Sequence, residues 1–389
     1  MKSIHPFPAR MAPDAVLRWL EKLPLGSVVL DPMCGSGVVV RQSITCGHNA
    51  FGFDIDPLAV LMSRVWTSEC PDNAAIFAEE IVASAMGSKA TRLPWIDDCD
   101  ETTKFVAYWF ADQQVSQLRR LAASILEARG FLPEEAINLL WLALSRTIIT
   151  KTVGASLAWD VSHSRPHKKR TTNDYDVFIG FRSAVNRIVD ILKSCEGQGT
   201  ANVDTGDARD MSRLADRSID AIFTSPPYLN AIDYLRGHKL SLVWMGYSIP
   251  DLRSKRSGAV GAERIERGDV PSICERVWRE QPALSELPAN FQGIVRRYVK
   301  DASAVIAEYA RVIKGVGQMG LVIGDSTLRG KFVSNSGIFD SVAREHGFKL
   351  MHRETRDILQ TKRYLPTASV SNTLEKRMRQ EIVAIYSPA

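Results

Sequence analysis

The stretch "GSVVLDPMCGSG", residues 26–37, decides the fold. Its β-branched apolar run, 28–30, predicts a buried strand, and the glycine-rich half predicts a tight turn. Asp31 closes the strand, while Gly35 and Gly37 allow the backbone to turn sharply and approach a ligand at the start of the next helix. The spacing differs from the Gly-x-Gly-x-x-Gly of dinucleotide-binding proteins, which argues against a dehydrogenase. The loop is therefore either a nucleotide-type ligand site or a structural strand-to-helix turn.

The segments on both sides of this stretch also alternate between helix and strand patterns. Residues 12–24, "APDAVLRWLEKLP", have apolar positions at helical spacing, and residues 37–47 suit a second helix. Residues 49–57, "NAFGFDIDP", indicate a second buried strand that ends in acidic residues. Alternating strands and helices of this kind predict a parallel sheet covered by helices.

Acidic residues end two of the predicted strands. Asp54 follows the glycine loop at the distance where a carboxylate can accept both hydroxyls of a ribose. Asp56 could instead cap the helix that follows it. Asp207, in "TGDARD", ends a later strand, although such a residue taken alone is more often a turn or helix cap than a ligand contact.

The rest of the chain falls into segments that differ in hydrophobic periodicity and composition. Amphipathic helices dominate 74–198, strands return in 199–248, and 249–292 is polar, rich in arginine and broken by Gly and Pro. Residues 381–388, "EIVAIYSP", are expected to form a final edge strand. We therefore expect an α/β domain in three parts with two insertions: 1–73, 199–248 and 293–389 for the domain, 74–198 for a helical insertion, and 249–292 for a loop-rich insertion.

Composition and charge limit the function classes. The chain has 389 residues, 45% hydrophobic and 24% charged, and its net charge of +5 permits an anionic partner without requiring one. Its six cysteines lack metal-ligand spacing, so we expect free thiols in a reducing compartment and no metal site. Because neither a signal-peptide core nor a membrane-spanning apolar stretch is present, the sequence predicts a cytoplasmic protein.

A second motif lies in residues 221–234, "AIFTSPPYLNAIDY", where an apolar run meets two prolines. Pro226 and Pro227 remove two backbone donors and fix two φ angles, so the chain cannot continue as a central strand or a regular helix. The loop is therefore rigid, and rigid acceptor groups can hold a reacting group in one orientation.

Together the motifs resemble the exocyclic-amino methyltransferases, S-adenosylmethionine-dependent enzymes that modify N4 of cytosine or N6 of adenine in DNA, many of them in restriction-modification systems. Ser-Pro-Pro-Tyr, residues 225–228, is similar to their catalytic motif, and residues 31–37 are similar to their cofactor loop. "HPFPARMAP", residues 5–13, resembles the segment that folds over the methionine end of the cofactor. The resemblance covers 1–73 and 199–389. It implies a Rossmann-like class I methyltransferase sheet and S-adenosyl-L-methionine as the cofactor.

The resemblance also implies roles for the rigid loop. The Ser225 side chain and the Pro226 carbonyl would accept hydrogen bonds from the target amino group, which favours a pyramidal nitrogen aimed at the methyl group. Pro227 would help to hold that carbonyl still. Tyr228 would stack on a target base that has left the duplex.

For the cofactor, the resemblance implies contacts from three motifs. The methionine end would be lined by the glycine loop and covered by the amino-terminal segment, and the ribose and adenine would be held at the later strand ends. His5 has an alternative as a partly exposed amino-terminal histidine, and Cys34 is not expected to act as a nucleophile. The implied cofactor residues are His5, Phe7, Pro8, Asp31, Pro32, Cys34, Gly35, Gly37, Asp54, Ile55, Asp207 and Ala208.

Two basic runs are candidate contacts to double-stranded DNA, because clustered cations suit phosphates. Either run could instead be a solvated charged surface, and the sequence leaves open which insertion reads the bases. Trp109 and the other tryptophans of the helical insertion are expected mainly in helix packing and not in base stacking. The candidate DNA contacts are Arg165, Lys168, Lys169 and Arg170 in "SHSRPHKKR", and Arg253, Lys255 and Arg256 in "RSKRSG".

The choice of base rests on Ser225. In the family that the chain resembles, a serine at this position is commoner in enzymes acting on cytosine N4, so cytosine is the expected target and adenine N6 the alternative. Two further alternatives are an RNA methyltransferase acting on guanine N2 and an inactive subunit that only recognises DNA. The sequence leaves open a cognate restriction endonuclease as partner and the oligomeric state.

Overall fold

The computed structural model describes residues 3–7, 11–89, 91–150, 152–159, 166–195, 197–229, 234–262, 271–358 and 380–389. Two site residues expected from the sequence, Pro8 and Arg165, lie outside these ranges. The chain divides into two units, which are described separately below. The helical unit consists of Met1–Pro8, Asp56–Glu196 and Asp233–Arg256, and the sheet unit consists of Ala9–Ile55, Gly197–Ile232 and Ser257–Ala389.

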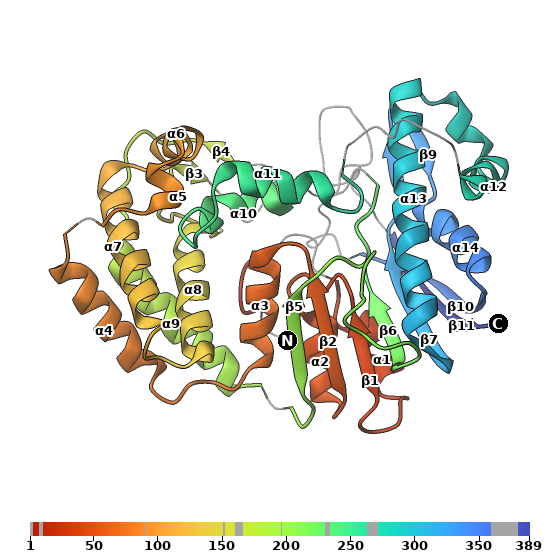
Figure 1. Cartoon of the computed structure of the whole chain (residues 1–389), viewed down its shortest axis with the longest axis horizontal. Coiled ribbons are helices and arrows are strands. Elements are labelled where there is room, and N and C mark those ends of the chain that lie inside the picture. The colour runs from red at the N-terminus through yellow and green to blue at the C-terminus, as the bar shows by residue number, and fades with distance from the viewer. Residues whose placement is uncertain are drawn as a thin grey trace. The chain divides into compact units, whose positions relative to one another are not determined.

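The sheet unit is built on a seven-stranded sheet of order β10-β11-β7-β6-β1-β2-β5 (Figure 1). Strands β5, β2, β1, β6 and β7 pair in parallel, and β11 is antiparallel to both of its neighbours. The predicted Rossmann-like α/β sheet is thereby confirmed. Its strands are β1 (Val28–Asp31), β2 (Asn49–Asp54), β5 (Ala201–Thr205), β6 (Ile219–Thr224), β7 (Ile313–Ile323), β10 (Phe348–Asp357) and β11 (Gln380–Pro388).

Helices cover both faces of this sheet because successive residues of a strand point to opposite sides. Val29 and Phe223 pack with α1 and α2 on one face, whereas Leu30 and Ile222 pack with α12, α13 and α14 on the other. This double burial explains the continuous apolar runs of the central strands. The remaining elements of the unit are α1 (Asp14–Leu20), α2 (Val38–Thr45), α12 (Ser272–Glu280), η1 (Pro282–Glu286), α13 (Ala289–Val312), α14 (Asn335–Glu345) and the hairpin β8 (Ser326–Leu328) with β9 (Lys331–Val333).

The position of β11 corrects one expectation. Residues 381–388 were expected at a sheet edge, but β11 lies between β7 and β10, and β10 forms the edge. The run from Val383 to Tyr386 is buried on both faces of the sheet, since Val383 and Ile385 join one core and Ala384 and Tyr386 the other. Burial on both faces suits an interior strand.

Gly320 provides a test of this packing. It lies in β7 opposite Phe223 of β6, and a Cβ at this position would overlap the Phe223 ring. We expect Gly320→Ala to lower the free energy of unfolding by about 1–3 kcal/mol, because an extra methyl group forces a packed core apart. Gly315→Ala is the matched control in the same strand, since a Cβ there meets no atom within 4 Å. Urea unfolding followed by circular dichroism measures both, and equal midpoints would contradict the prediction.

The helical unit is organised around α8, whose residues are buried on nearly every side. It packs against α3, α4, α7, α9 and α10 (Figure 1). An all-round apolar helix of this kind is expected at the centre of a bundle. The elements of the unit are α3 (Pro57–Thr67), α4 (Ala74–Gly87), α5 (Pro94–Asp97), α6 (Asp100–Trp109), α7 (Asp112–Ala128), α8 (Glu134–Ile148), β3 (Ala158–Trp159), β4 (His167–Lys168), α9 (Val177–Lys193), α10 (Tyr234–Leu242) and α11 (Ile249–Gly258), whose last two residues fall in the sheet unit.

The boundaries of this unit differ from the expected insertion 74–198. Helices α3 and α10, which the sequence assigned to the α/β domain, pack on α8 and belong to the helical unit. The segment 249–292 also differs from its expected loop-rich character, because its described residues include α11, α12 and η1. Within the described residues, no helix combines the length and the apolarity that a membrane span requires.

Candidate active site

The strand order of the sheet unit defines where a ligand is expected. The chain leaves β1 towards β2 and β5 on one side, then returns to β6 and β7 on the other, so the order reverses between β1 and β6. In open α/β sheets ligands bind outside the carboxyl ends of the strands at such a switch point. The loops that follow these two strands are 32–37 and 225–229, which are the two motifs found in the sequence.

The glycine loop is shaped by two residues in the left-handed region. Gly35 has φ +49° and Gly37, which precedes α2, has φ +84°. The backbone N–H of Gly35 donates to Asp54 Oδ2 at 2.8 Å, and the N–H of Cys34 donates to the Phe53 carbonyl at 2.8 Å. The predicted ribose residue is therefore bonded directly to the predicted cofactor loop.

The other strand-end acid has a local partner. Asp207 accepts hydrogen bonds from Arg209 through its backbone N–H at 2.9 Å, Nε at 2.9 Å and Nη2 at 2.6 Å. Burial favours the neutral carboxyl, but the hydrogen bonds from Arg209 outweigh it and hold the pKa of Asp207 below its usual value. Asp207 is thus an anchored anion, and its Oδ2 keeps one lone-pair direction for a further donor. Next to it, Ala208 is buried in the core.

Asp31 is the buried acid of the site. Burial raises its pKa to about 7, and the nearby Thr224 side chain and the Met33 backbone N–H oppose the increase only in part. Asp31 closes β1 and Thr224 closes β6, so the two residues stand at the ends of neighbouring strands at the switch point. At neutral pH the carboxyl can change its charge in response to a bound cation.

This pKa predicts a pH dependence of stability. In the unfolded chain Asp31 loses its proton near its ordinary pKa of 3.8, whereas the folded protein keeps it up to about 7. Between these values the folded state binds more protons, so stability decreases as the pH rises, by roughly 4 kcal/mol across the window. Asp31→Asn should remove this pH-dependent contribution to stability. Urea midpoints at pH 5 and pH 8 test it, and an unchanged pH difference in the variant would refute it.

The Ser225–Tyr228 loop is held by the residues around it. Ser225 Oγ donates to the Val322 carbonyl at 2.9 Å and lies 3.4 Å from the Tyr228 hydroxyl. The Tyr298 hydroxyl donates to the Pro227 carbonyl at 2.8 Å. Among the described residues no donor contacts the Pro226 carbonyl. The loop therefore presents one carbonyl that is available to an incoming amino group, beside a serine oxygen that can still accept.

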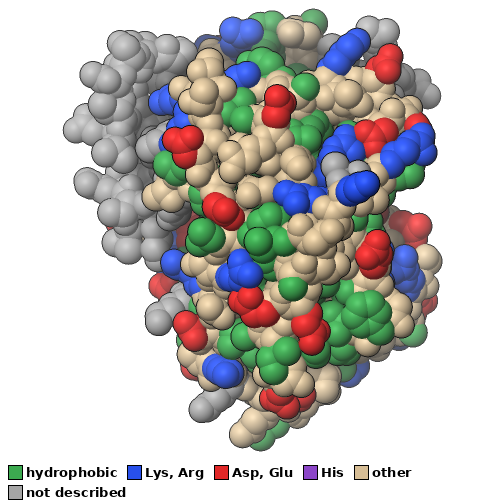
Figure 2. Space-filling model, turned by 90° about the vertical axis from the view of Figure 1, so that its left-hand side faces the viewer, with side chains coloured by type: hydrophobic (Ala, Val, Ile, Leu, Met, Phe, Trp, Pro, Cys, Tyr) green, Lys and Arg blue, Asp and Glu red, His purple; other side chains and the backbone are tan. Residues whose placement is uncertain are grey.

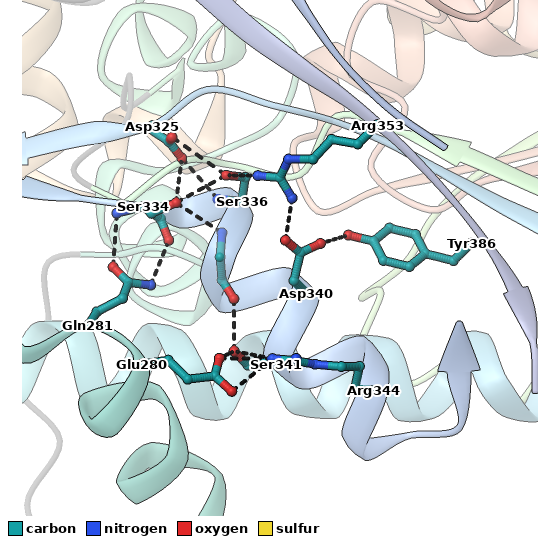
Figure 3. Close-up of polar contacts among 11 residues, drawn as sticks. Glu280, Gln281, Asp325, Ser334, Ser336, Asp340, Ser341, Arg344, Arg353 and Tyr386 are labelled. Carbon is teal, nitrogen blue, oxygen red and sulfur yellow. Dashed lines mark hydrogen bonds and ion pairs between the residues drawn. The ribbon is translucent and has the colours of Figure 1, made fainter. Parts of the chain in front are cut away.

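A polar network supports the strand end beside this loop (Figure 3). Asp325, two residues after the end of β7, accepts from the Ser336 backbone N–H at 3.0 Å. The Gln281 side-chain amide donates to the Ser334 carbonyl and accepts from the Ser334 N–H, both at 3.0 Å. Arg353 donates to Ser336 Oγ at 2.8 Å. The adjacent Gly324 backbone contacts the Tyr228 hydroxyl, whose pKa is raised by burial. Tyr298 and this network could not be predicted from the sequence, because a buried Tyr within a helix and serines at the start of α14 belong to no recognisable motif.

The amino-terminal segment lies in the helical unit. His5 is 1% exposed, and its Nε2 is 2.9 Å from Ser145 Oγ, so the alternative of a partly exposed histidine is wrong. Burial and the neighbouring Arg146 lower the pKa of His5 well below its usual value. Phe7 stacks on Tyr234 with ring centroids 4.8 Å apart. Packing inside the helical unit therefore fixes both residues.

Asp56 begins α3 and binds two partners. Its Oδ1 accepts from the Leu58 N–H at 2.9 Å, which confirms the cap considered from the sequence. Its Oδ2 lies 2.5 Å from His238 Nδ1, and both side chains are buried. The buried pair joins α3 to α10 and explains in part why α10 belongs to the helical unit.

The basic runs differ from one another. Lys168 and Lys169 are exposed, whereas Arg253 forms an ion pair with Glu101. An ion-paired arginine has less charge to offer a phosphate, so the second run is the weaker candidate. All six cysteines lie within the described residues and none forms a disulfide bond there, which agrees with the predicted thiols.

Comparison with known proteins gives a consistent result. M.MvaI of Kocuria varians, a type II methyltransferase, is 22% identical over 273 residues, which are 64% of this chain and 58% of the relative. M.BsoBI of Geobacillus stearothermophilus, also a type II methyltransferase, is 22% identical over 259 residues, or 60% of this chain and 50% of the relative. The chain is similar to type II methyltransferases. It spans about half the length of these two relatives.

Other comparisons add little. No family model matches the chain. A SAM-dependent methyltransferase from Methanosarcina mazei aligns with a TM-score of 0.34 and 9% identity, covering 94% of each chain. A TehB-like SAM-dependent methyltransferase from Corynebacterium glutamicum aligns with a TM-score of 0.30 and 9% identity, covering 98% of this chain and 89% of its own. Alignments at these TM-scores carry no conclusion about this chain.

Proposed function

We propose that the chain is an S-adenosyl-L-methionine-dependent DNA methyltransferase that modifies N4 of cytosine. The observation that carries the proposal is the Ser225–Tyr228 loop at the switch point of the sheet, next to a glycine loop that is bonded to Asp54. The similarity to type II methyltransferases supports methyl transfer and DNA as the substrate. Ser225 before Pro-Pro-Tyr favours cytosine over adenine.

The residues of the sheet unit suit such a cofactor. Its sulfonium and ammonium groups are cationic, and the buried carboxyl of Asp31, with a pKa near 7, can ionise beside a cation. Gly35 and Gly37 bring the backbone close to the ligand. Asp54 accepts the Gly35 N–H, and a carboxylate can accept several hydrogen bonds, which suits the hydroxyls of a ribose. When bound, the cofactor supplies an electrophilic methyl group.

The catalytic loop would act by orientation. An exocyclic amino group is a poor nucleophile because its lone pair is delocalised into the ring. If Ser225 Oγ and the Pro226 carbonyl accept hydrogen bonds from its two N–H groups, the nitrogen lone pair is directed out of the ring plane. The hydrogen bonds from Ser225 to Val322 and from Tyr298 to Pro227 hold these acceptors in place before substrate arrives, which is electrostatic preorganisation.

Mass spectrometry of nucleosides tests the proposal directly. DNA would be isolated from cells that express the protein and from cells that express Tyr228→Ala. N4-methylcytosine that depends on the intact protein supports the full proposal. N6-methyladenine would retain the mechanism and overturn the choice of base. Neither mark in DNA, with a methylated guanine in RNA, would replace DNA by RNA as the substrate, and neither mark in either polymer would favour a subunit that only recognises DNA.

A further inference from the structure

One surface of the helical unit combines cations with aromatic rings. Lys168 Nζ lies 4.6 Å from the centroid of the Tyr108 ring, and Lys239 Nζ lies 5.1 Å from that of Phe105. Trp109 meets Tyr108 edge-on, with centroids 5.0 Å apart. Tyr108 is 54% exposed, so its ring is accessible to a partner. We call these five residues the α6 surface.

The α6 surface is built from segments that are far apart in the sequence. The Leu157 N–H donates to the Trp109 carbonyl at 2.7 Å, and the Lys169 N–H donates to the Leu157 carbonyl at 3.1 Å, which fixes the β3–β4 hairpin to the end of α6. On the other side, the Ile249 N–H donates to Thr102 Oγ1 at 3.0 Å. The position of Lys168 over Tyr108 therefore follows from backbone contacts and not from a chance side-chain arrangement.

The charge of this region favours an anionic partner. Together α6, α10 and residues 167–170 contain six lysines and arginines against two acidic residues, Asp100 and Glu101. Glu101 is engaged by Arg253 of α11. The side of the molecule drawn in Figure 2 mixes blue and red side chains. Elsewhere in the helical unit, charges of opposite sign pair, as Arg182 of α9 does with Glu79 of α4. A cluster of one sign attracts polyanions, whereas a mixed surface does not.

We infer that the α6 surface binds the sugar-phosphate backbone of duplex DNA. The inference rests on the proposed function and assigns the backbone contact to the α6 surface instead of the 249–292 segment. Lys168 and Lys239 each contact a phosphate. Tyr108 holds the Lys168 ammonium over its ring and donates its hydroxyl to the backbone. Trp109, assigned to packing by the sequence, supports the Tyr108 ring.

Fluorescence anisotropy of a labelled DNA duplex at several salt concentrations tests the inference. The Lys168→Gln, Lys239→Gln double variant should reduce the slope of log affinity against log salt by about 2, because each lost phosphate contact removes roughly one unit. Tyr108→Ala should weaken binding about fivefold, and Tyr108→Phe less, because the ring is retained. Unchanged melting temperatures of the variants would exclude a folding defect.

Lys22→Gln is the matched control. Lys22 Nζ lies 4.7 Å from the Trp19 ring in the sheet unit, so it is, like Lys168, an exposed lysine on an aromatic ring, and both slope and affinity should be retained. If the unaltered protein binds DNA and the double variant keeps its slope, the α6 surface is the wrong site while the proposed function stands. If the unaltered protein binds duplex RNA tightly and no DNA, the substrate class itself is wrong.

Discussion

Replacement of Tyr228 by alanine is expected to lower kcat about 100-fold while cofactor binding stays within about twofold. Without the ring, the target base loses its stacking partner and the amino group is no longer held in line with the methyl group, and misplacement of this size costs about two orders of magnitude. The contact of 3.4 Å between the Tyr228 hydroxyl and Ser225 Oγ places the ring beside the acceptor groups of the loop. Single-turnover methylation and calorimetric titration of the cofactor measure the two quantities separately.

Tyr228→Phe distinguishes the contribution of the ring from that of its hydroxyl. The phenylalanine variant keeps the stacking surface and loses the contact with Ser225 and Gly324, so kcat should fall less than about tenfold. A phenylalanine variant as inactive as the alanine variant would show that the hydroxyl, and not the ring, is the functional group. A large loss of cofactor affinity in both variants would show that Tyr228 contacts the cofactor and not the target base.

Asp54→Ala is expected to weaken cofactor binding about 100-fold. Two hydrogen bonds from ribose hydroxyls to a carboxylate are lost, each worth about 1.5–3 kcal/mol at most, and part of the loss is recovered by water. The variant also releases the Gly35 N–H, which loosens the glycine loop. At saturating cofactor, kcat should recover to within a few fold of the original value. Calorimetry and kinetics at high cofactor concentration test this division.

Asp56→Ala serves as the control for Asp54. Asp54 is the last residue of β2 and Asp56 follows two residues later, but Asp56 caps α3 and pairs with His238 in the helical unit. Its loss leaves His238 without its buried partner and should lower thermal stability, with little effect on cofactor affinity. If Asp56→Ala reduced cofactor affinity as much as Asp54→Ala, the assignment of Asp54 to the ribose would fail.

The sheet and its two loops were predictable because local patterns encode them. The run before Asp31 is apolar at consecutive positions, and the glycines after it have the positive φ angles that only such residues adopt easily. The Pro-Pro pair likewise marks a strand end in any context. These features depend on neighbouring residues in the sequence, so the sequence alone was enough.

The remaining features depend on contacts between distant segments. Nothing near Arg253 indicates that Glu101, 152 residues away, pairs with it. The assignment of α10 to the helical unit follows from its packing on α8 and from the contact of His238 with Asp56, neither of which a periodicity can show. The interior position of β11 was missed for the same reason, since only its partners β7 and β10 distinguish it from an edge strand.

The location of β11 also affects how the protein is made. β7 and β10 do not pair with each other, and the strand between them follows both in the chain. During synthesis from the amino terminus, one backbone edge of β7 therefore stays unpaired until β11 has left the ribosome. The helical unit, rich in contacts between neighbouring helices, can form earlier. We therefore expect the helices to assemble first and the sheet to close last, so that an incomplete chain exposes a strand edge that invites aggregation.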